Sequence, residues 1–124
     1  MTESSQITKL PSSIKKLVQC VEKAAEERKN IERCMRTLKA KGLIYASPHW
    51  RDGRYLYLLY PLVNGEPRRR EYIGADPERI RAAQQGVERA QQYDMLSQRL
   101  NSLDAAVARA AESVASAVSA LQIW

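Results

Sequence analysis

The last third of the chain carries a seven-residue repeat of apolar side chains, and this repeat restricts the fold more than any other feature of the sequence. Its members alternate in steps of four and three residues: Leu96, Leu100, Leu103, Val107, Ala110, Val114, Ala117 and Leu121. This alternation places all of them on one seam of a left-handed coiled coil. We therefore predict a helix from about residue 77 to 122, roughly 70 Å long at 1.5 Å per residue.

The start of this helix is marked by Asp76, Pro77 and Glu78. Asp is a favoured N-cap, Pro fits the first helical position, and Glu suits the positive end of the helix dipole. Four apolar residues upstream of the repeat follow the same spacing one residue out of phase: Ile80, Ala83, Val87 and Ala90. The seam is therefore expected to change partner or register near Tyr93.

A second long helix is predicted from about residue 13 to 41. Pro11-Ser12-Ser13 provides a start and Lys41-Gly42 a stop. Between them, apolar residues recur at three-four spacing: Ile14, Leu17, Val18, Val21, Ala24, Ile31, Met35 and Leu38. Arg28 interrupts this seam, where it can either pair with an acid across the seam or extend its charged end into water.

The expected fold is mainly α: two long helices form an antiparallel coiled-coil pair, and a two- to three-stranded antiparallel β-hairpin is inserted between them. The absence of Phe and the abundance of Ala, Gln, Glu, Arg and Leu favour this helical framework. We expect a flexible N-terminus at 1–11, a helix-hairpin-helix module at 12–104 and a C-terminal oligomerisation helix at 105–124. Residues 42–45 are a possible short strand, and "SPHWRDG" has the composition of a turn.

The C-terminal helix is expected to join two chains. The first helix is predicted to be about 17 residues shorter than the second, so the tail would project beyond it with its apolar seam in water. The residues expected to form the interface are Leu103, Val107, Ala110, Val114 and Leu121. A homodimer is the simplest closed assembly.

The chain is expected to be cytoplasmic and not bound to a membrane. No apolar run approaches the roughly 20 residues of a membrane span, and the N-terminus lacks the order of a signal peptide. Cys20 and Cys34 fall on one predicted helix about 21 Å apart, so they cannot form a disulfide within one chain.

Positive charge is concentrated in the first 74 residues. The net charge is +6, made up of +5 in residues 1–43, +2 in residues 44–74 and −1 in the remainder. Arg33, Arg36 and Lys39 lie near the end of the first predicted helix, just before the hairpin. A solvated helix face would account for a single charge run, but two basic segments that converge favour a binding surface.

The stretch "RYLYLLYPLVNGEPRRREYIG", residues 54–74, has the pattern of a hairpin. With Asn64-Gly65 at the centre of a type I′ turn, the register pairs Leu59 with Arg70, Leu58 with Glu71, Tyr57 with Tyr72 and Leu56 with Ile73. One face then carries Tyr55, Tyr57, Leu59, Arg68, Arg70 and Tyr72, and the other carries Leu56, Leu58 and Ile73, with Tyr60 and Arg69 near the turn. The aliphatic face is expected to pack on the helices.

The tyrosine-arginine face is predicted to bind DNA, with RNA possible. Arginine forks onto phosphate or guanine, a two-stranded ribbon fits the DNA major groove, and tyrosine rings can stack on unpaired bases. The predicted contact residues are Arg54, Tyr55, Tyr57, Arg68, Arg69, Arg70 and Tyr72, with Arg33, Arg36 and Lys39 from the helix. The alternative is that the tyrosines belong to the core and the arginines are only solvated.

Residues 54–84, "RYLYLLYPLVNGEPRRREYIGADPERIRAAQ", resemble the arm-type DNA-binding module of phage-type tyrosine recombinases and related small proteins of mobile elements. The shared order is a strand, a glycine turn, a basic strand that ends in an aliphatic-glycine pair, and a helix that starts near a proline. The resemblance implies that Tyr57, Arg68, Arg69 and Arg70 contact DNA. The chain departs from a recombinase because it is too short for a catalytic domain, and the heptad helix is foreign to that module.

A second resemblance is to winged helices, in which a recognition helix ends in a "KGLI"-like segment before a wing. The stretch "RTLKAKGLIYASPHWRDGRYLYLLYP" follows this order, with Arg33, Arg36 and Lys39 on the helix and the hairpin as the wing. The first predicted helix shows no internal turn, which argues against this geometry. Both resemblances imply the same function.

Catalysis finds little support in the sequence. His49 is the only histidine and falls in a predicted turn, and no Cys/His metal spacing or Gly-rich phosphate loop is present. We therefore expect no enzyme, no metal and no cofactor. His49 and Trp50 are expected to close the loop beneath the sheet, although Trp50, beside Arg51 and Arg54, could also contact a ligand.

The favoured function is a nucleic-acid-binding accessory or regulatory protein. The rival class is a protein-interaction adaptor or inhibitor of a nucleic-acid-associated machine, which would dock on an acidic protein surface. Because tyrosine and arginine are also enriched in protein hot spots, composition does not separate the two classes.

Overall fold

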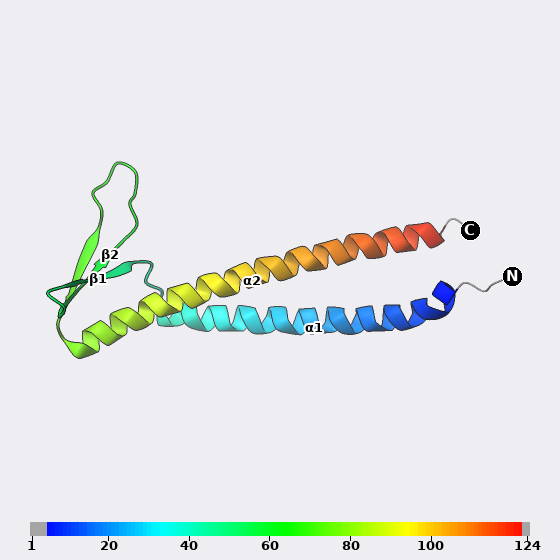
Figure 1. Ribbon diagram of the computed structural model, residues 1–124, viewed down its shortest axis with the longest axis horizontal. Coiled ribbons are helices and arrows are strands. Elements are labelled where there is room, and N and C mark those ends of the chain that lie inside the picture. The colour runs from blue at the N-terminus through cyan, green and yellow to red at the C-terminus, as the bar shows by residue number, and fades with distance from the viewer. Residues whose placement is uncertain (1–4, 123–124) are drawn as a thin grey trace. The chain divides into compact units, whose positions relative to one another are not determined.

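Two long helices packed together, with a three-stranded antiparallel sheet inserted between them, form the fold (Figure 1). The structure is a computed structural model and describes residues 5–122. The elements are α1 (Ser5–Lys41), β1 (Ser47–Arg51), β2 (Tyr55–Leu59), β3 (Arg70–Gly74) and α2 (Pro77–Leu121). The predicted mainly-α architecture is therefore confirmed. Among the described residues, no helix is both long enough and apolar enough to span a membrane.

These elements belong to two units. The helix-pair unit contains the chain up to Arg33 and from Gln98 onward, so it holds most of α1 and the second half of α2. The sheet unit contains Cys34–Ser97, with the three strands, the end of α1 and the first half of α2.

The first helix begins earlier than predicted. α1 starts at Ser5, so Pro11 lies inside it and residues 5–11 of the segment predicted to be flexible are helical. Residues 1–4 lie outside the described part of the chain. Proline lacks the N–H that would bond the carbonyl four residues before it, but Pro11 is exposed, so water can satisfy that carbonyl. The prediction that the first helix begins at about residue 13, after Pro11, is therefore wrong.

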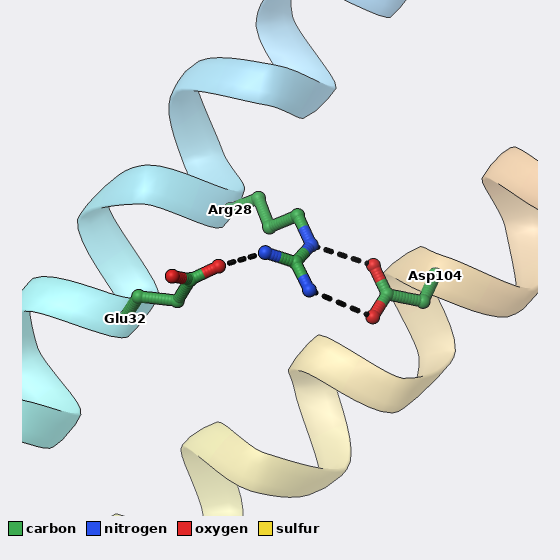
Figure 2. Close-up of polar contacts among 3 residues, drawn as sticks. All are labelled: Arg28, Glu32 and Asp104. Carbon is green, nitrogen blue, oxygen red and sulfur yellow. Dashed lines mark hydrogen bonds and ion pairs between the residues drawn. The ribbon is translucent and has the colours of Figure 1, made fainter.

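The helix-pair unit is held by apolar contacts and by ion pairs between α1 and α2. Ile31 is buried on α1. Arg28 donates from Nε to Asp104 Oδ1 at 2.9 Å and from Nη2 to Oδ2 at 3.3 Å, and its remaining nitrogen pairs with Glu32 of its own helix (Figure 2). Arg99 Nε donates to Glu27 at 2.6 Å. Arg28 thus pairs across the seam, which is the first of the two alternatives that the sequence left open.

Because α1 starts at Ser5, it is long enough to lie beside the tail of α2. Arg28 and Asp104 lie level with each other in the antiparallel pair. From this point α1 extends over roughly 34 Å to Ser5, whereas α2 extends over roughly 26 Å to Leu121. The expectation that the tail projects beyond the first helix is therefore wrong, because α1 is long enough to accompany it. Residues 123–124 lie outside the described chain.

The sheet has the order β1-β2-β3, and β1 comes from the stretch that was predicted to be a turn. Asp52 and Gly53 have φ values of 54° and 69°, and the Arg54 N–H donates to the Arg51 carbonyl at 3.2 Å. Positive φ at both central residues is the type I′ pattern, for which Asp-Gly is a preferred pair. This turn folds "SPHWR" back on β2.

Residues 42–45, predicted as a possible strand, instead form a loop against α2. The Ile44 N–H donates to the Gly86 carbonyl at 3.1 Å, Arg89 Nε donates to the Gly42 carbonyl at 2.7 Å, and the Tyr45 hydroxyl donates to Asp94 at 3.0 Å. The backbone hydrogen bond of Ile44 is thus made to a helix rather than to a neighbouring strand.

The β2–β3 register is largely as predicted. Tyr57 pairs with Tyr72, Leu58 with Glu71 and Leu59 with Arg70. A β-bulge next to Leu56 shifts the fourth pair, so that Leu56 lies opposite Gly74 and not opposite Ile73. A bulge adds one unpaired residue to one strand, which a uniform two-residue period cannot anticipate.

The turn at Asn64-Gly65 is not of type I′. Gly65 has a φ of 81°, whereas Asn64 is not among the residues with positive φ, and the Glu66 N–H donates to the Val63 carbonyl at 3.1 Å. A positive φ only at the third position matches a type II turn. The chain between Leu59 and Arg70 is a long loop rather than a tight two-residue hairpin.

The core of the sheet unit lies between the aliphatic face of the sheet and α2. It contains Leu56, Leu58, Ile73, Ala83 and Val87, with Ile44, Ala46, Tyr60 and Ile80 packed around them. The predicted packing of the aliphatic face on a helix is therefore confirmed. The predicted change of partner along α2 is also found, because residues 80–87 pack in this core whereas Arg99 and Asp104 pair with α1.

Candidate nucleic-acid interface

The face of the sheet opposite the core, called here the outer face, is assembled by the register of the three strands. His49 pairs with Tyr57, and Tyr57 pairs with Tyr72, so these three residues form a row across the sheet. Arg51 and Tyr55 lie on one side of this row, and Ser47, Leu59 and Arg70 lie on the other. Directly paired residues share a face, so all eight side chains belong to the outer face.

Two tyrosines in the central row are in ring contact. The centroids of Tyr57 and Tyr72 lie 4.9 Å apart, and their planes are tilted by 51°. Tyr72 is 51% exposed, and Tyr57 is partly exposed. This places two adjoining aromatic rings on an accessible surface, in a geometry that aromatic pairs favour.

A depression of about 340 Å³ lies beside this pair on the outer face. Five of its lining residues belong to the outer face, namely His49, Arg51, Tyr57, Leu59 and Arg70, and the sixth is Trp50, whose register partner is the core residue Leu56. Neither the Arg51 nor the Arg70 side chain has a hydrogen bond, ion pair or ring contact with any of residues 5–122. Both guanidinium groups are therefore available to a ligand.

The three arginines at 68–70 do not share one environment. Arg68 Nε donates to the Tyr60 carbonyl at 3.1 Å, and the Arg69 guanidinium lies 4.3 Å from the Tyr60 ring centroid. Both residues precede β3 and hold the start of the long loop, whereas Arg70 lies within β3. The structure therefore separates two arginines that bind Tyr60 from one at the depression.

Arg54 and Tyr55 form a further cationic and aromatic pair at the β1–β2 turn. The Arg54 guanidinium lies 5.3 Å from the Tyr55 ring centroid. Tyr55 belongs to the outer face, so this pair extends the aromatic surface toward the turn. Both residues were predicted as contacts.

The helical residues predicted to share the interface are not part of the depression. Arg36 and Lys39 lie on the portion of α1 that belongs to the sheet unit, are exposed, and do not line it. Arg33 belongs to the helix-pair unit, where it bonds Asn30 at 3.5 Å. Their participation in binding stays a prediction.

The position of His49 and Arg51 on the outer face was not predicted from the sequence. The sequence interpretation placed His49 and Trp50 in a loop beneath the sheet, but His49 lies on β1 opposite Tyr57, and Trp50 is 48% exposed. The signal that would have found them is Asp52-Gly53, a preferred I′ pair that is flanked by two strand-compatible stretches.

The strand residues of the outer face carry no acidic side chain. Glu71 is the only acid in β1, β2 and β3, and its register position is on the opposite face, paired with Leu58. Glu71 accepts a hydrogen bond of 3.0 Å from the Tyr60 hydroxyl. Burial and this bond raise the pKa of Tyr60 above its ordinary value. The outer face is therefore cationic where it is charged.

The described residues contain no group of three or more His, Cys, Asp or Glu side chains that could hold a metal ion.

Comparison with protein-family models, with curated proteins and with solved structures finds no match for this chain. The resemblance of residues 54–84 to the recombinase module thus stays a prediction.

Proposed function

We propose that this protein is a non-catalytic nucleic-acid-binding accessory or regulatory protein, and that the outer face of its sheet is the binding surface. The observation that carries this proposal is the combination of the Tyr57–Tyr72 ring pair with two unpartnered arginines, Arg51 and Arg70, on a face whose strands bring no acid. Arginine donors match phosphate geometry, and aromatic rings match base faces.

The rival is an adaptor or inhibitor that docks the same face on an acidic protein surface. Salt dependence distinguishes the two. Counterion release makes the affinity for nucleic acid fall linearly with salt on logarithmic axes, with a slope near the number of phosphates neutralised. Two or more contacts per chain predict a slope of about −1.8 or steeper on duplex DNA and about −1.4 or steeper on a single strand.

The test is a titration of fluorescently labelled mixed-sequence DNA and RNA oligonucleotides with the full chain at several salt concentrations. The double variant Arg51→Ala/Arg70→Ala is expected to lose most of the affinity and to flatten the slope by about two. Arg79→Ala/Arg81→Ala, which removes the same charge from exposed positions on α2 outside the helix-pair unit, is the matched control.

Binding that survives in the Arg51→Ala/Arg70→Ala variant would place the contact elsewhere, with Arg33, Arg36 and Lys39 as the next residues to change. Absence of binding to any oligonucleotide at low salt would contradict the proposal and favour the protein-interaction class.

We also propose that the protein works as a homodimer joined through the helix-pair unit. Nine large apolar residues of this unit are between 41% and 68% exposed: Ile7, Leu10, Ile14, Val18, Val21, Val107, Val114, Val118 and Leu121. In residues 105–122 only Arg109 and Glu112 are charged, and the rest of this segment is largely Ala and Ser. Small and apolar residues on several sides of a helix favour burial against a further helix pair.

The composition of this interface differs from the one predicted from sequence. The sequence assigned it to α2 alone, through Leu103, Val107, Ala110, Val114 and Leu121. Leu103 and Ala110 are half-buried in a single chain, and α1 contributes five of the nine exposed apolar residues. A second copy would thus meet both helices. Two linked chains would present two sheets, which raises the apparent affinity through effective concentration.

A further inference from the structure

We propose that the ligand of the outer face is single-stranded nucleic acid, whose unpaired bases stack on the His49–Tyr57–Tyr72 row. This inference deepens the proposed function and rests on it. It specifies that the ligand is single-stranded and adds His49 to the contact residues.

The central row has the chemistry of a stacking platform rather than of a reader of base edges. Base edges in a duplex groove are read by Arg, Lys, Asn, Gln, Asp, Glu, Ser and Thr side chains. None of these types is present in the row, which presents one imidazole and two phenol rings. Flat aromatic groups bind the faces of bases instead, and they do so with little dependence on sequence.

Base faces are accessible only when the bases are unpaired. In a duplex each base is covered by its neighbours in the stack, so an aromatic row on a sheet meets edges and backbone alone. In a single strand the bases can separate and lie on aromatic side chains. The ring contact of Tyr57 with Tyr72 at 4.9 Å gives two adjoining surfaces for successive bases.

The depression provides a place for one base beside these rings. At about 340 Å³ it is at the lower end of the range for small-ligand sites, roughly 300–1,000 Å³. Tyr57 and Leu59 supply its apolar lining, and His49 supplies a flat polar ring. A base is likewise a flat apolar surface with a polar edge.

The two arginines lie where the backbone of a bound strand would pass. Arg51 is on edge strand β1 and Arg70 is on edge strand β3, on opposite sides of the aromatic row. Strand spacings of about 4.8 Å and residue spacings of about 3.3 Å place their Cα atoms roughly 16 Å apart. A single strand that crosses the row diagonally therefore meets one guanidinium before the stacked bases and another after them.

The experiment compares the affinity of the full chain for a labelled 15-nucleotide mixed-sequence DNA, for the RNA of the same sequence, and for the corresponding DNA duplex, at one salt concentration. We expect at least tenfold tighter binding of the single strands than of the duplex. The DNA and RNA arms show which single strand is preferred, and preference for either one over the duplex supports the inference.

Two substitutions separate stacking from a structural role. Tyr57→Ala is expected to weaken single-strand binding about tenfold or more, whereas Tyr57→Phe keeps the ring and is expected to stay within about threefold of the wild type. His49 lies exposed on edge strand β1, so His49→Ala removes a ring from the same row with little loss of packing. Circular dichroism melting checks that each variant is folded.

A spectroscopic readout is available as well. Trp50 lines the depression, and the chain has one other tryptophan, Trp124, so a Trp124→Phe variant reports from Trp50 alone. Addition of unlabelled oligothymidine is expected to change its emission, and Tyr57→Ala is expected to reduce that change.

The outcomes distinguish the inference from the proposed function. Equal or tighter binding of the duplex, with a loss in Arg51→Ala/Arg70→Ala, would overturn the single-strand inference and leave the proposed function standing. Single-strand binding that is unaffected in folded Tyr57→Ala and His49→Ala variants would overturn the stacking site. Failure to bind every oligonucleotide would overturn both.

Discussion

At the residue scale, Gly86 shows how one position on a helix can hold a loop in place. A Cβ atom on Gly86 would lie 2.4 Å from Ile44 Cδ1 and 2.7 Å from Ile44 Cγ1, closer than real side chains approach. The Ile44 N–H also donates to the Gly86 carbonyl. The glycine that weakens the helix locally is thus the position where the loop after α1 packs on α2.

We expect Gly86→Ala to lower the free energy of unfolding by about 1 kcal/mol, as measured by urea denaturation. The helix-propensity gain of roughly 1 kcal/mol is outweighed by an overpacking cost of about 1–3 kcal/mol. An Ile44→Ala background removes the two closest contacts and leaves only the approach of the residue-44 Cβ at 3.3 Å, so the destabilisation caused by Gly86→Ala should be much smaller there. A stabilising effect in the wild-type background would contradict the close approach of Ile44.

A second residue-scale prediction concerns the two faces of β2. Leu58 is 1% exposed in the core, and Leu59, its neighbour, lies half-buried on the outer face. Leu58→Ala is expected to reduce the free energy of unfolding by about 2–5 kcal/mol, because it removes buried methyl groups and leaves a cavity. Leu59→Ala is the matched control, and its loss in denaturant unfolding should be less than half as large. Similar losses would mean that the faces are assigned wrongly.

At the element scale, the pairing of α1 with α2 includes a charge that interrupts an apolar seam. Arg28 bonds Asp104 through two nitrogens (Figure 2). This hydrogen bond lowers the pKa of Asp104 and raises that of Arg28. The ion pair lies where these turns of the two helices are level with each other.

The lowered pKa of Asp104 predicts a dependence of stability on acid. A carboxyl group whose pKa is lower in the folded state stabilises the fold above its unfolded pKa, about 3.9, and this contribution disappears as the pH falls through the folded-state value. The difference in unfolding free energy between wild type and Asp104→Asn should therefore shrink below about pH 4. Glu112→Gln, an exposed change on the same helix, is the control. A difference that is constant from pH 7 to pH 2 would contradict the ion pair in solution.

How far the sequence predicts each element depends on whether its signal is local. The heptads predict α2 to within one residue at its end, and the alternation of Leu56 and Leu58 with tyrosines predicts the buried face. β1 was missed because "SPHWR" has no alternation of its own and becomes a strand only by pairing with β2. The arginines at 68–70 were treated alike because their different contacts with Tyr60 depend on the path of a loop. The placement of Tyr55, Tyr57 and Tyr72 on one face of the sheet was therefore predicted, whereas the grouping of His49 and Arg51 with Tyr57 was not.

At the scale of the whole molecule, a single chain leaves nine large apolar residues of the helix-pair unit exposed to water. All nine lie in residues 7–21 and 107–121, at the end of the unit that contains the start of α1 and the end of α2. Burial of each leucine or valine side chain is worth roughly 1.5–3 kcal/mol when complete. A second copy could cover this end of both helices at once.

We expect light scattering to report a dimer for the full chain and a monomer, or a strongly concentration-dependent mixture, for Ile14→Glu/Val118→Glu. The two glutamates would place charge in the contact that we propose. Ser102→Glu, an exposed change on α2 outside the proposed contact, should remain dimeric. Circular dichroism should show helix in all three proteins. A wild-type chain that is monomeric at high concentration would contradict the dimer.

One unit is a single continuous segment of the chain and the other is made of two separate segments, and this difference affects the order in which they fold. The sheet unit is one continuous segment, whereas the helix-pair unit joins two segments whose ion-paired residues, Arg28 and Asp104, are 76 positions apart. The entropy lost in closing a flexible loop grows with the length of that loop. Folding of the intervening segment first would shorten the effective loop, so the sheet unit is expected to nucleate and the outer helical segments to close afterwards, from Ile31 and Leu100 outward.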